Sequence, residues 1–200
     1  MNSLKIDVIT SLLSDFEPPI TEPNGNTRRA AVAAILRKQE SHIEALFILR
    51  AEKQGDPWSG QMAFPGGHLE TSDESLRHAA ERETFEEIGL DLHQHAKYLG
   101  PIVEVRANPR GRNLDMIVSP FVYLLTNNDP PLDLNYEVAD VLWGSLDDMY
   151  NGNNIAELEF DLQGSSQMFP GYQVGDEIVW GLTRMMLHHL FLMLNPDWEP

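Results

Sequence analysis

Three glutamates stand close together in one short segment of the chain. Glu86 and Glu87 follow Glu83 by three and four residues, so a helix turning about 100° per residue places all three within about 60° of one another. Like charges at these spacings repel, and carboxylates near a helix C-terminus face the negative end of the helix dipole. A divalent cation would reverse both penalties. The segment therefore predicts a metal site, and the alternative for a Glu-Glu pair is a solvated acidic face.

The residues before these glutamates predict how the helix is placed. Leu76, Ala79 and Ala80 lie on the same helical face, one and two turns earlier. This face of the helix therefore begins with apolar residues and ends with the three glutamates, so it forms a continuous stripe. The pattern places the glutamates where the helix leaves the core and borders a cleft. The pattern predicts a helix from about Glu74 to Ile88 that stops at Gly89.

Length and composition limit the classes of function. Two hundred residues with 42% hydrophobic content fit one globular domain over residues 1–200. A formal charge of -17 argues against a nucleic acid polymer or an anionic membrane as partner, because both are held mainly by Lys and Arg. The chain has no cysteine, so a metal must be bound by carboxylate, carbonyl or imidazole groups. Mg²⁺ or Mn²⁺ suits that supply, with a small phosphate compound as ligand.

No export signal or membrane span is expected from the sequence near either end. Residues 1–16 lack the basic region and the cleavage site of an export signal, so a cytoplasmic protein is expected. The hydrophobic stretch from Ile178 to Leu194 is interrupted by Arg184, His188 and His189, and it is short for a membrane span. It predicts a buried C-terminal helix that starts near Val179. A homodimer is compatible with the sequence.

Runs of aliphatic and β-branched residues predict a mixed α/β (α+β) fold. The expected strands are Ala30–Leu36, Ala45–Arg50, Tyr98–Val105, Met116–Leu125 and Glu137–Trp143. The expected loops are Arg106–Arg112, Asn127–Asn135, Asn151–Asn154 and Gln163–Gln167.

The motif around the glutamates resembles the Nudix box. That pattern is Gly, five residues, Glu, seven residues, Arg-Glu, an apolar residue, any residue, Glu-Glu, any residue, Gly and an apolar residue. The matching residues here are Phe64-Pro65-Gly66-Gly67, Glu74, Arg82-Glu83, Glu86-Glu87 and Gly89-Leu90. Six residues instead of five separate Gly67 from Glu74, and Thr84 occupies the apolar position. The resemblance implies a Nudix-type α/β/α sandwich with a mixed central sheet.

The resemblance also implies roles for the motif residues. Mg²⁺ or Mn²⁺ would be held by Glu83, Glu86 and Glu87, with a backbone carbonyl of Gly66 or Gly67 as a further ligand. Glu83 is the first candidate for the catalytic base. Arg82 is expected to orient a carboxylate. Glu74 is expected to be structural, either paired with Arg82 or forming a capping box with Thr71.

Further site residues are expected outside the box. In this family another base or ligand often comes from a distant loop, and Glu137 is the best placed acid, although it could equally be an exposed residue that opens a strand. The arginines that could bind substrate phosphates, or could simply make loops soluble, are Arg50, Arg106, Arg110 and Arg112. Tyr172, Trp58 and Phe169 could stack on a base, or could be core residues.

A second pattern, before the box, resembles that of coenzyme A pyrophosphatases. Arg50-Ala51, Gly60 and Phe64-Pro65-Gly66-Gly67 match it, whereas Asp56 stands where a second arginine is expected. The implied activity is hydrolysis of the diphosphate linkage of a small nucleoside diphosphate derivative, with coenzyme A or an acyl derivative as substrate. The alternatives are ADP-ribose, NADH, nucleotide sugars and dinucleoside polyphosphates. A catalytically silent nucleotide-binding domain would be expected to have lost Arg82-Glu83 or Glu86-Glu87, and this chain retains both.

Overall fold

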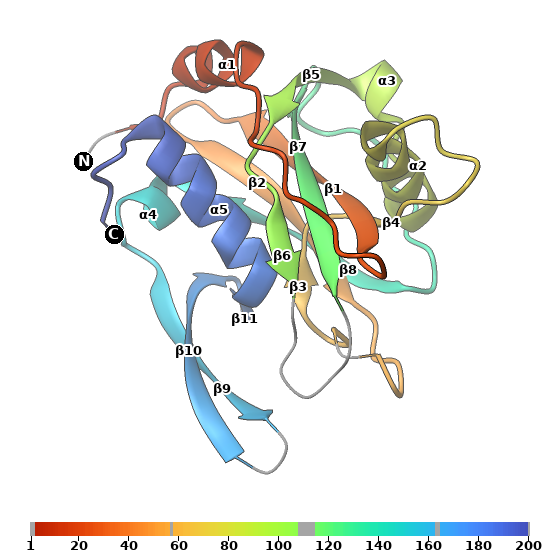
Figure 1. Ribbon diagram of the computed structural model, residues 1–200. Coiled ribbons are helices and arrows are strands. Elements are labelled where there is room, and N and C mark those ends of the chain that lie inside the picture. Colours follow the sequence, from red (N-terminus) through yellow and green to blue (C-terminus); the bar gives the residue numbers. More distant parts are fainter. Residues whose placement is uncertain (1–2, 57, 108–114, 163–164, 200) are drawn as a thin grey trace.

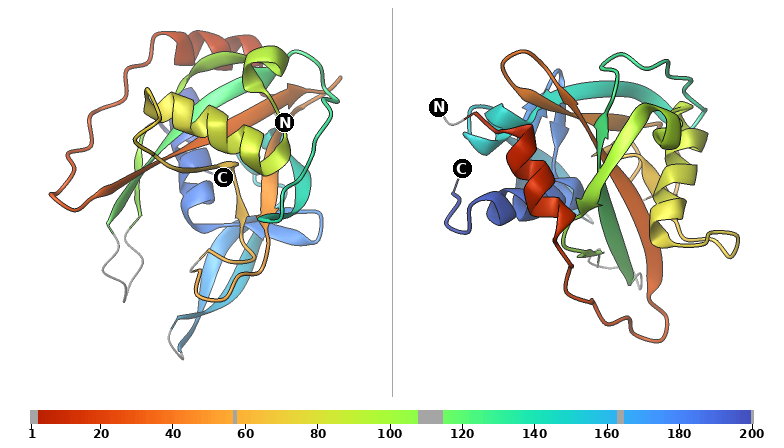
Figure 2. Two further views of the ribbon diagram at one scale, coloured as in Figure 1. Left: turned by 90° about the vertical axis from the view of Figure 1, so that its right-hand side faces the viewer. Right: turned by 90° about the horizontal axis from the view of Figure 1, so that it is seen from above.

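The central element of the protein is a mixed sheet with helices on both faces. The computed structural model describes residues 3–56, 58–107, 115–162 and 165–199. Helix α2 (Leu76–Ile88) lies on one face of the sheet, and helices α1 (Ile6–Ser14) and α5 (Gly181–Leu194) lie on the other (Figure 1). The view from above shows the sheet between these two layers (Figure 2). The predicted α/β/α sandwich with a mixed sheet is confirmed.

The large sheet has the strand order β3-β2-β1-β7-β5. Further strands pair beside this path: β4 with β1, β6 with β7, and β8 with β2. Only β1 and β7 run parallel, and all other described pairs are antiparallel. The bounds are β1 Arg28–Lys38, β2 Ile43–Arg50, β3 Met62–Ala63, β4 Gly66–His68, β5 Ala96–Pro101, β6 Val105–Ala107, β7 Met116–Leu125 and β8 Val138–Ser145.

The parallel pair β1 and β7 is the centre of the core. Both strands are rich in aliphatic residues and are buried on both faces along most of their length, as expected for strands covered on two sides. Ala31 on the α2 face packs against Ala79 and Ala80 of the helix. These small side chains let the helix approach the sheet closely, and they confirm the predicted apolar start of the helical stripe.

Three strands form a second, smaller sheet of order β11-β10-β9. Strands β9 (Ile155–Leu162) and β10 (Ser165–Val174) form a long antiparallel pair that extends away from the main sheet (Figure 1), and β11 (Glu177–Val179) leads into α5. Trp180 packs against Phe160 and Phe169, so the turn into α5 holds the pair to the body of the protein.

Most of the predicted elements are observed, with two corrections. The strand predicted over Tyr98–Val105 is two strands, because β5 shifts its register near Gly100 and ends at Pro101, a residue without a backbone N–H to donate. The chain resumes pairing as β6, which includes Arg106. The predicted loop Gln163–Gln167 is also wrong from Ser165 onwards, because these residues pair with β9.

The remaining helices are short, and the C-terminal helix is buried as predicted. Helix α3 (Leu92–His95) follows α2, and α4 (Leu146–Tyr150) follows β8. Helix α5 begins at Gly181, two residues after the predicted start, and buries Met186, Leu187, Leu190 and Phe191. No helix among the described residues is long and apolar enough to cross a membrane.

Candidate metal and catalytic site

The site is built where strand β4 meets helix α2. Gly66 pairs with Val32 and Gly67 with Ala31 of β1. A side chain on Gly66 would collide with the backbone of these two residues, and its φ of 148° is one that other residues rarely adopt. A Cβ on Gly67 would occupy the place of the Glu83 carboxylate. Both glycines are therefore needed to bring the strand backbone against the acidic end of the helix.

Glu87 is a buried carboxylate with a single close hydrogen-bond donor. Its side chain is 4% exposed, and its Oε2 accepts a hydrogen bond of 2.8 Å from the backbone N–H of Gly66. Burial raises the pKa of Glu87 to about 7, against the lowering effects of the Gly66 N–H and Arg50. The neighbouring charges of Glu83 and Glu137 raise this pKa further.

Glu83 lies beside Glu87 and is more accessible, its side chain being 18% exposed against 4% for Glu87. Burial raises its pKa, Arg82 lowers it, and Glu86 and Glu70 raise it. Its carboxylate lies directly against the Cα of Gly67 and is 3.1 Å from a guanidinium nitrogen of Arg82. Two partly desolvated, mutually repelling carboxylates thus face the backbone of the Gly66-Gly67 segment.

Glu86 lies apart from the other two glutamates. Its side chain is 54% exposed, and its Oε2 is 3.2 Å from Nη1 of Arg82. Among the described residues, no three carboxylate or imidazole side chains converge closely enough to hold one metal ion. The structure thus brings Glu83 and Glu87 together at Gly67 and leaves Glu86 at the rim.

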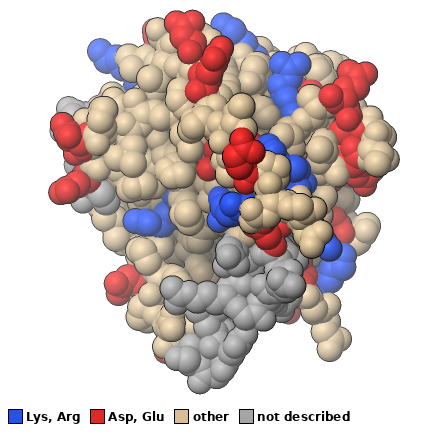
Figure 3. Space-filling view, viewed as in Figure 1, with Lys and Arg blue, Asp and Glu red and all other residues tan. Residues whose placement is uncertain are grey.

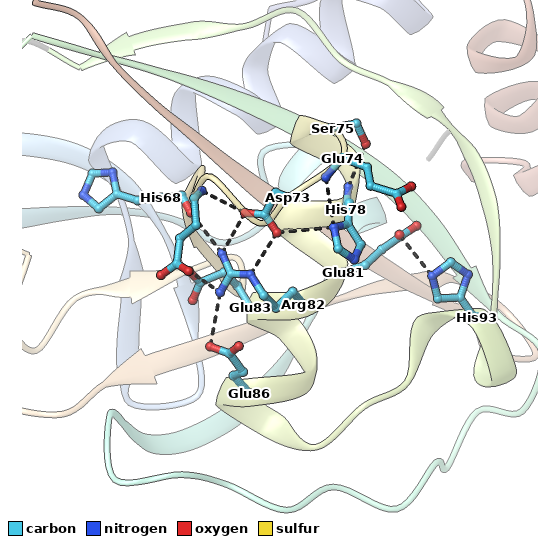
Figure 4. A network of polar contacts seen from close by, with 11 residues as sticks. His68, Asp73, Glu74, Ser75, His78, Glu81, Arg82, Glu83, Glu86 and His93 are labelled. Atoms are coloured by element: carbon cyan, nitrogen blue, oxygen red, sulfur yellow. Dashed lines mark hydrogen bonds and ion pairs between the residues drawn. The ribbon is translucent and has the colours of Figure 1, made fainter.

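Arg82 is held by a set of acceptors that fixes its guanidinium (Figure 4). Asp73 receives two hydrogen bonds of 3.0 Å from Nε and Nη2, and the carbonyl of His68 receives a third. The Asp73 hydrogen bonds are the main cause of the raised pKa of Arg82. Nη1 faces the carboxylates of Glu83 and Glu86, and the role of Arg82 in orienting them for catalysis stays a prediction.

The partner of Arg82 is Asp73, which corrects the prediction for Glu74. The backbone N–H of Glu74 contacts His78, and its side chain pairs with no described residue. The helix is capped by Ser75, whose Oγ accepts from the N–H of His78, so no capping box with Thr71 forms. Counted from Gly67, Asp73 follows after five residues, which is the Nudix spacing. The sequence carried this signal, but counting backwards from Arg82 selected Glu74.

Thr84 occupies the expected apolar position without leaving an unsatisfied hydroxyl. It is fully buried, and its Oγ1 donates a hydrogen bond of 2.7 Å to the carbonyl of Ala80 one turn earlier. The departure from the box pattern is therefore satisfied within the helix.

A distant loop places Glu137 beside the end of α2. The helix stops at Gly89, with φ 67°, and the carbonyls of Glu87 and Ile88 accept hydrogen bonds from the N–H groups of Asn135 and Asp133. These bonds hold the loop so that the charge of Glu137 acts on Glu87. Lys53, which sequence analysis did not select, is 3.3 Å from the Glu137 carboxylate.

Two of the four arginines predicted to bind phosphate lie within the described residues, and both form ion pairs with carboxylates. Arg50 donates to Asp56 at 2.9 Å and lies 3.9 Å from Glu87. Arg106 pairs with Asp115 through two nitrogens, at 2.7 and 3.0 Å. Arg110 and Arg112 lie outside the described residues. Asp56, which stands in place of an arginine, is therefore the partner of Arg50.

The residues present fit a divalent cation. Two partly or wholly buried carboxylates with raised pKa values repel each other, and the backbone of Gly67 approaches them without a side chain between. Oxygen ligands of this kind suit Mg²⁺ or Mn²⁺. The metal-ligand roles of Glu83, Glu86, Glu87 and Gly67 stay predictions.

We predict that replacing Asp73 destabilises the protein and that replacing Glu74 does not. Asp73→Asn should lower the free energy of unfolding by about 1 to 3 kcal/mol, because Arg82 loses a charged, buried acceptor. Glu74→Gln is the matched control and should change it by less than about 0.5 kcal/mol. Urea denaturation of both variants measures this, and an equal loss in both would contradict the assignment of Asp73.

We also predict that Glu87→Gln stabilises the metal-free protein at high pH. The folded-state pKa of about 7 lies above the ordinary value of about 4.3, so ionising Glu87 opposes folding, and this penalty grows as the pH rises from about 4 to 7. In the presence of chelator at pH 8, the free energy of unfolding of the variant should exceed that of the parent by roughly 2 to 3 kcal/mol. This difference should become smaller as the pH is lowered towards 5.

The control for this prediction is Glu86→Gln, which removes a glutamate of the same helix whose side chain is exposed instead of buried. Denaturation curves at several pH values supply the comparison. A Glu87→Gln variant that is less stable than the parent at pH 8 would show that the buried charge supports the fold.

Comparison with known proteins places the chain in a family. Residues 27–163 match the model of the NUDIX domain. The chain is 30% identical to an uncharacterized protein of Schizosaccharomyces pombe, over 97% of this chain and 74% of that protein. It is 28% identical to the uncharacterized Nudix hydrolase NudL of Photorhabdus laumondii, over 92% of this chain and 94% of that protein.

Solved structures agree on the fold. A MutT NUDIX hydrolase from Burkholderia pseudomallei matches with a TM-score of 0.52 and 19% identity, over 82% of this chain and 98% of that one. A binary complex of a C. elegans Ap4A hydrolase matches with a TM-score of 0.51 and 24% identity, over 62% of this chain and 85% of that one. With the helix, the glycine pair and the Arg82 network in place, the chain belongs to the Nudix family and is a Nudix pyrophosphohydrolase.

Proposed function

We propose that the protein hydrolyses the diphosphate linkage of a small nucleoside diphosphate derivative at the Glu83 and Glu87 carboxylates. The observation that carries this proposal is the buried carboxylate of Glu87 and the partly buried carboxylate of Glu83, which repel each other and lie against the backbone of Gly66-Gly67. Glu83, Glu86, Glu87 and the carbonyl of Gly67 would hold Mg²⁺ or Mn²⁺. When bound, such an ion neutralises diphosphate charge and makes a bound water more acidic.

The protein's own residues position the reacting groups and take up the proton. Arg82, fixed by Asp73, keeps the Glu83 carboxylate in one orientation. Glu83 is the proposed base, and its raised pKa brings it closer to the working range of a base near neutral pH. Glu137, whose charge reaches Glu87 from the distant loop, is the alternative base.

Coenzyme A or an acyl derivative is the proposed substrate. Its support is Arg50-Ala51 and Gly60 at their spacings before Phe64-Pro65-Gly66-Gly67, which a general Nudix box does not require. Asp56 occupies the place of a second arginine and neutralises Arg50, so the cation for the 3′-phosphate of coenzyme A must come from elsewhere. ADP-ribose, NADH, nucleotide sugars and dinucleoside polyphosphates are the alternatives, the last being the class acted on by the Ap4A hydrolase named above.

We predict that activity requires Mg²⁺ or Mn²⁺ and the Glu83 carboxylate. Excess EDTA should abolish turnover and added metal should restore it. Glu83→Gln should lower kcat by about 10² to 10⁴ fold, the range for a lost general base. Glu74→Gln, which alters a motif residue without a described ion pair, should stay within about threefold of the parent. Full turnover in EDTA would refute the proposed chemistry.

The substrate prediction is tested by comparing kcat/KM under one metal concentration. The panel is coenzyme A, dephospho-coenzyme A, ADP-ribose, NADH, a nucleotide sugar and Ap4A, with products identified by mass. Coenzyme A should have the highest value and should yield adenosine 3′,5′-bisphosphate and 4′-phosphopantetheine. A value tenfold below that of ADP-ribose, about 1.4 kcal/mol of lost transition-state binding, would exclude coenzyme A and leave the hydrolase assignment intact.

A further inference from the structure

Arg184 differs from the other described arginines because it is half-buried and has no anionic partner. On the face shown in Figure 3, Lys and Arg form small groups, several of them next to Asp or Glu. The arginines that pair with a carboxylate are Arg29, Arg37, Arg50, Arg77, Arg82 and Arg106. Within the described part of the chain, Arg28 and Arg184 have no such pair. Arg28 is exposed, so its charge is hydrated, whereas Arg184 is partly withdrawn from water.

The side chains around Arg184 also lack hydrogen-bond partners. Its Nε is buried and has none among the described residues. The guanidinium carbon lies 5.5 Å from the centre of the Tyr172 ring. Tyr172 is fully buried, and its hydroxyl is likewise without a partner. His188, one helical turn after Arg184, has a buried Nδ1 that is also unpaired.

Among the described residues, the charges that shift the pKa values of this cluster are those of Arg184 and His189. Burial raises the pKa of the Tyr172 hydroxyl, and Arg184 lowers it. Burial lowers the pKa of His188, and Arg184 and His189 lower it further. His188 is therefore neutral near pH 7 and can donate one N–H. The cluster presents a cation and several donors, and no described carboxylate compensates them.

We propose that Arg184, Tyr172 and His188 form a binding site for a phosphate-class oxyanion. Buried donors and a partly buried guanidinium without acceptors cost free energy, and several oxygens of one anion would satisfy them together. Water could accept hydrogen bonds from the hydroxyl and the imidazole, but it would leave the guanidinium charge uncompensated. Because Arg184 is half-buried, an anion can reach it from solvent.

The site is separate from the carboxylates of α2. Arg184 and His188 lie on α5, on the opposite face of the main sheet from α2 (Figure 2). The two regions are connected through the Thr183 hydroxyl, which donates to the carbonyl of Met62 in β3 at 3.3 Å, shortly before the Gly66-Gly67 segment. The anion could be free phosphate or a phosphate group of the nucleotide substrate, since both present the same oxygens. The proposal does not rest on the hydrolytic activity.

The test is a titration of the metal-free protein with inorganic phosphate by calorimetry, at constant ionic strength set with sodium chloride. The parent should bind phosphate and gain thermal stability in proportion to its occupancy. Arg184→Gln should weaken binding by about tenfold or more, because a charge-assisted contact is lost. Tyr172→Phe should weaken binding as well, yet in phosphate-free buffer it should be at least as stable as the parent, because it removes an unpaired hydroxyl.

The matched control is Arg28→Gln, which removes the other unpaired arginine from an exposed position and should leave the affinity within about twofold. Phosphate binding no stronger than that of chloride, or equal losses in Arg28→Gln and Arg184→Gln, would overturn the proposal. So would unchanged affinity in Tyr172→Phe together with unchanged affinity in Arg184→Gln.

Kinetics identify the source of the anion. If the substrate supplies the phosphate group, inorganic phosphate should inhibit competitively, and Arg184→Gln should raise KM with little change in kcat. If free phosphate is the ligand, KM should be unaffected by Arg184→Gln, and phosphate should still stabilise the protein at saturating product nucleotide. The two kinetic outcomes differ only in the source of the anion, and both are compatible with the proposed site. The calorimetric titrations of the variants test whether the site binds phosphate.

Discussion

The hydrogen bond from the backbone N–H of Gly66 to the buried carboxylate of Glu87 links the parts from which the site is made. Gly66 belongs to a strand pressed against β1, and Glu87 belongs to the helix whose small residues pack on that same strand. The bond therefore fixes the end of the helix relative to the sheet. Without it, the Glu87 carboxylate would be buried with only a long contact to Arg50, which is an arrangement that proteins rarely tolerate.

Charge balance around this bond depends on Arg82. The guanidinium of Arg82 contacts the carboxylates of Asp73, Glu83 and Glu86, and it also donates to the carbonyl of His68. The contact with Asp73 uses Nε and Nη2, so Nη1 can face Glu83 while Arg82 stays anchored to Asp73. Arg82 is not among the groups that lower the pKa of Glu87, which burial keeps at about 7.

Local patterns in the sequence were sufficient to predict helix α2, its end at Gly89 and the close approach of Gly66-Gly67 to the glutamates. These features depend on residue spacing along one segment. Local patterns were insufficient where tertiary contacts decide. The choice of Asp73 over Glu74 as the partner of Arg82 follows from the path of the loop before the helix. The β9–β10 pair was missed although Glu157 and Glu159 alternate with Leu158 and Phe160, a period typical of strands. Its support comes from Trp180, beyond both strands.

The parallel pairing of β1 with β7 has a consequence for how the chain folds. Arg28 lies opposite Met116, so the two strands meet only after about ninety intervening residues have crossed over. Those residues include β4 and α2, whose mutual contacts span a short stretch of chain. The entropy of closing the long connection must be overcome before the central pair contributes stability. This entropic cost opposes folding, and cleavage of the chain between β1 and β7 would remove the connection that keeps the closure intramolecular.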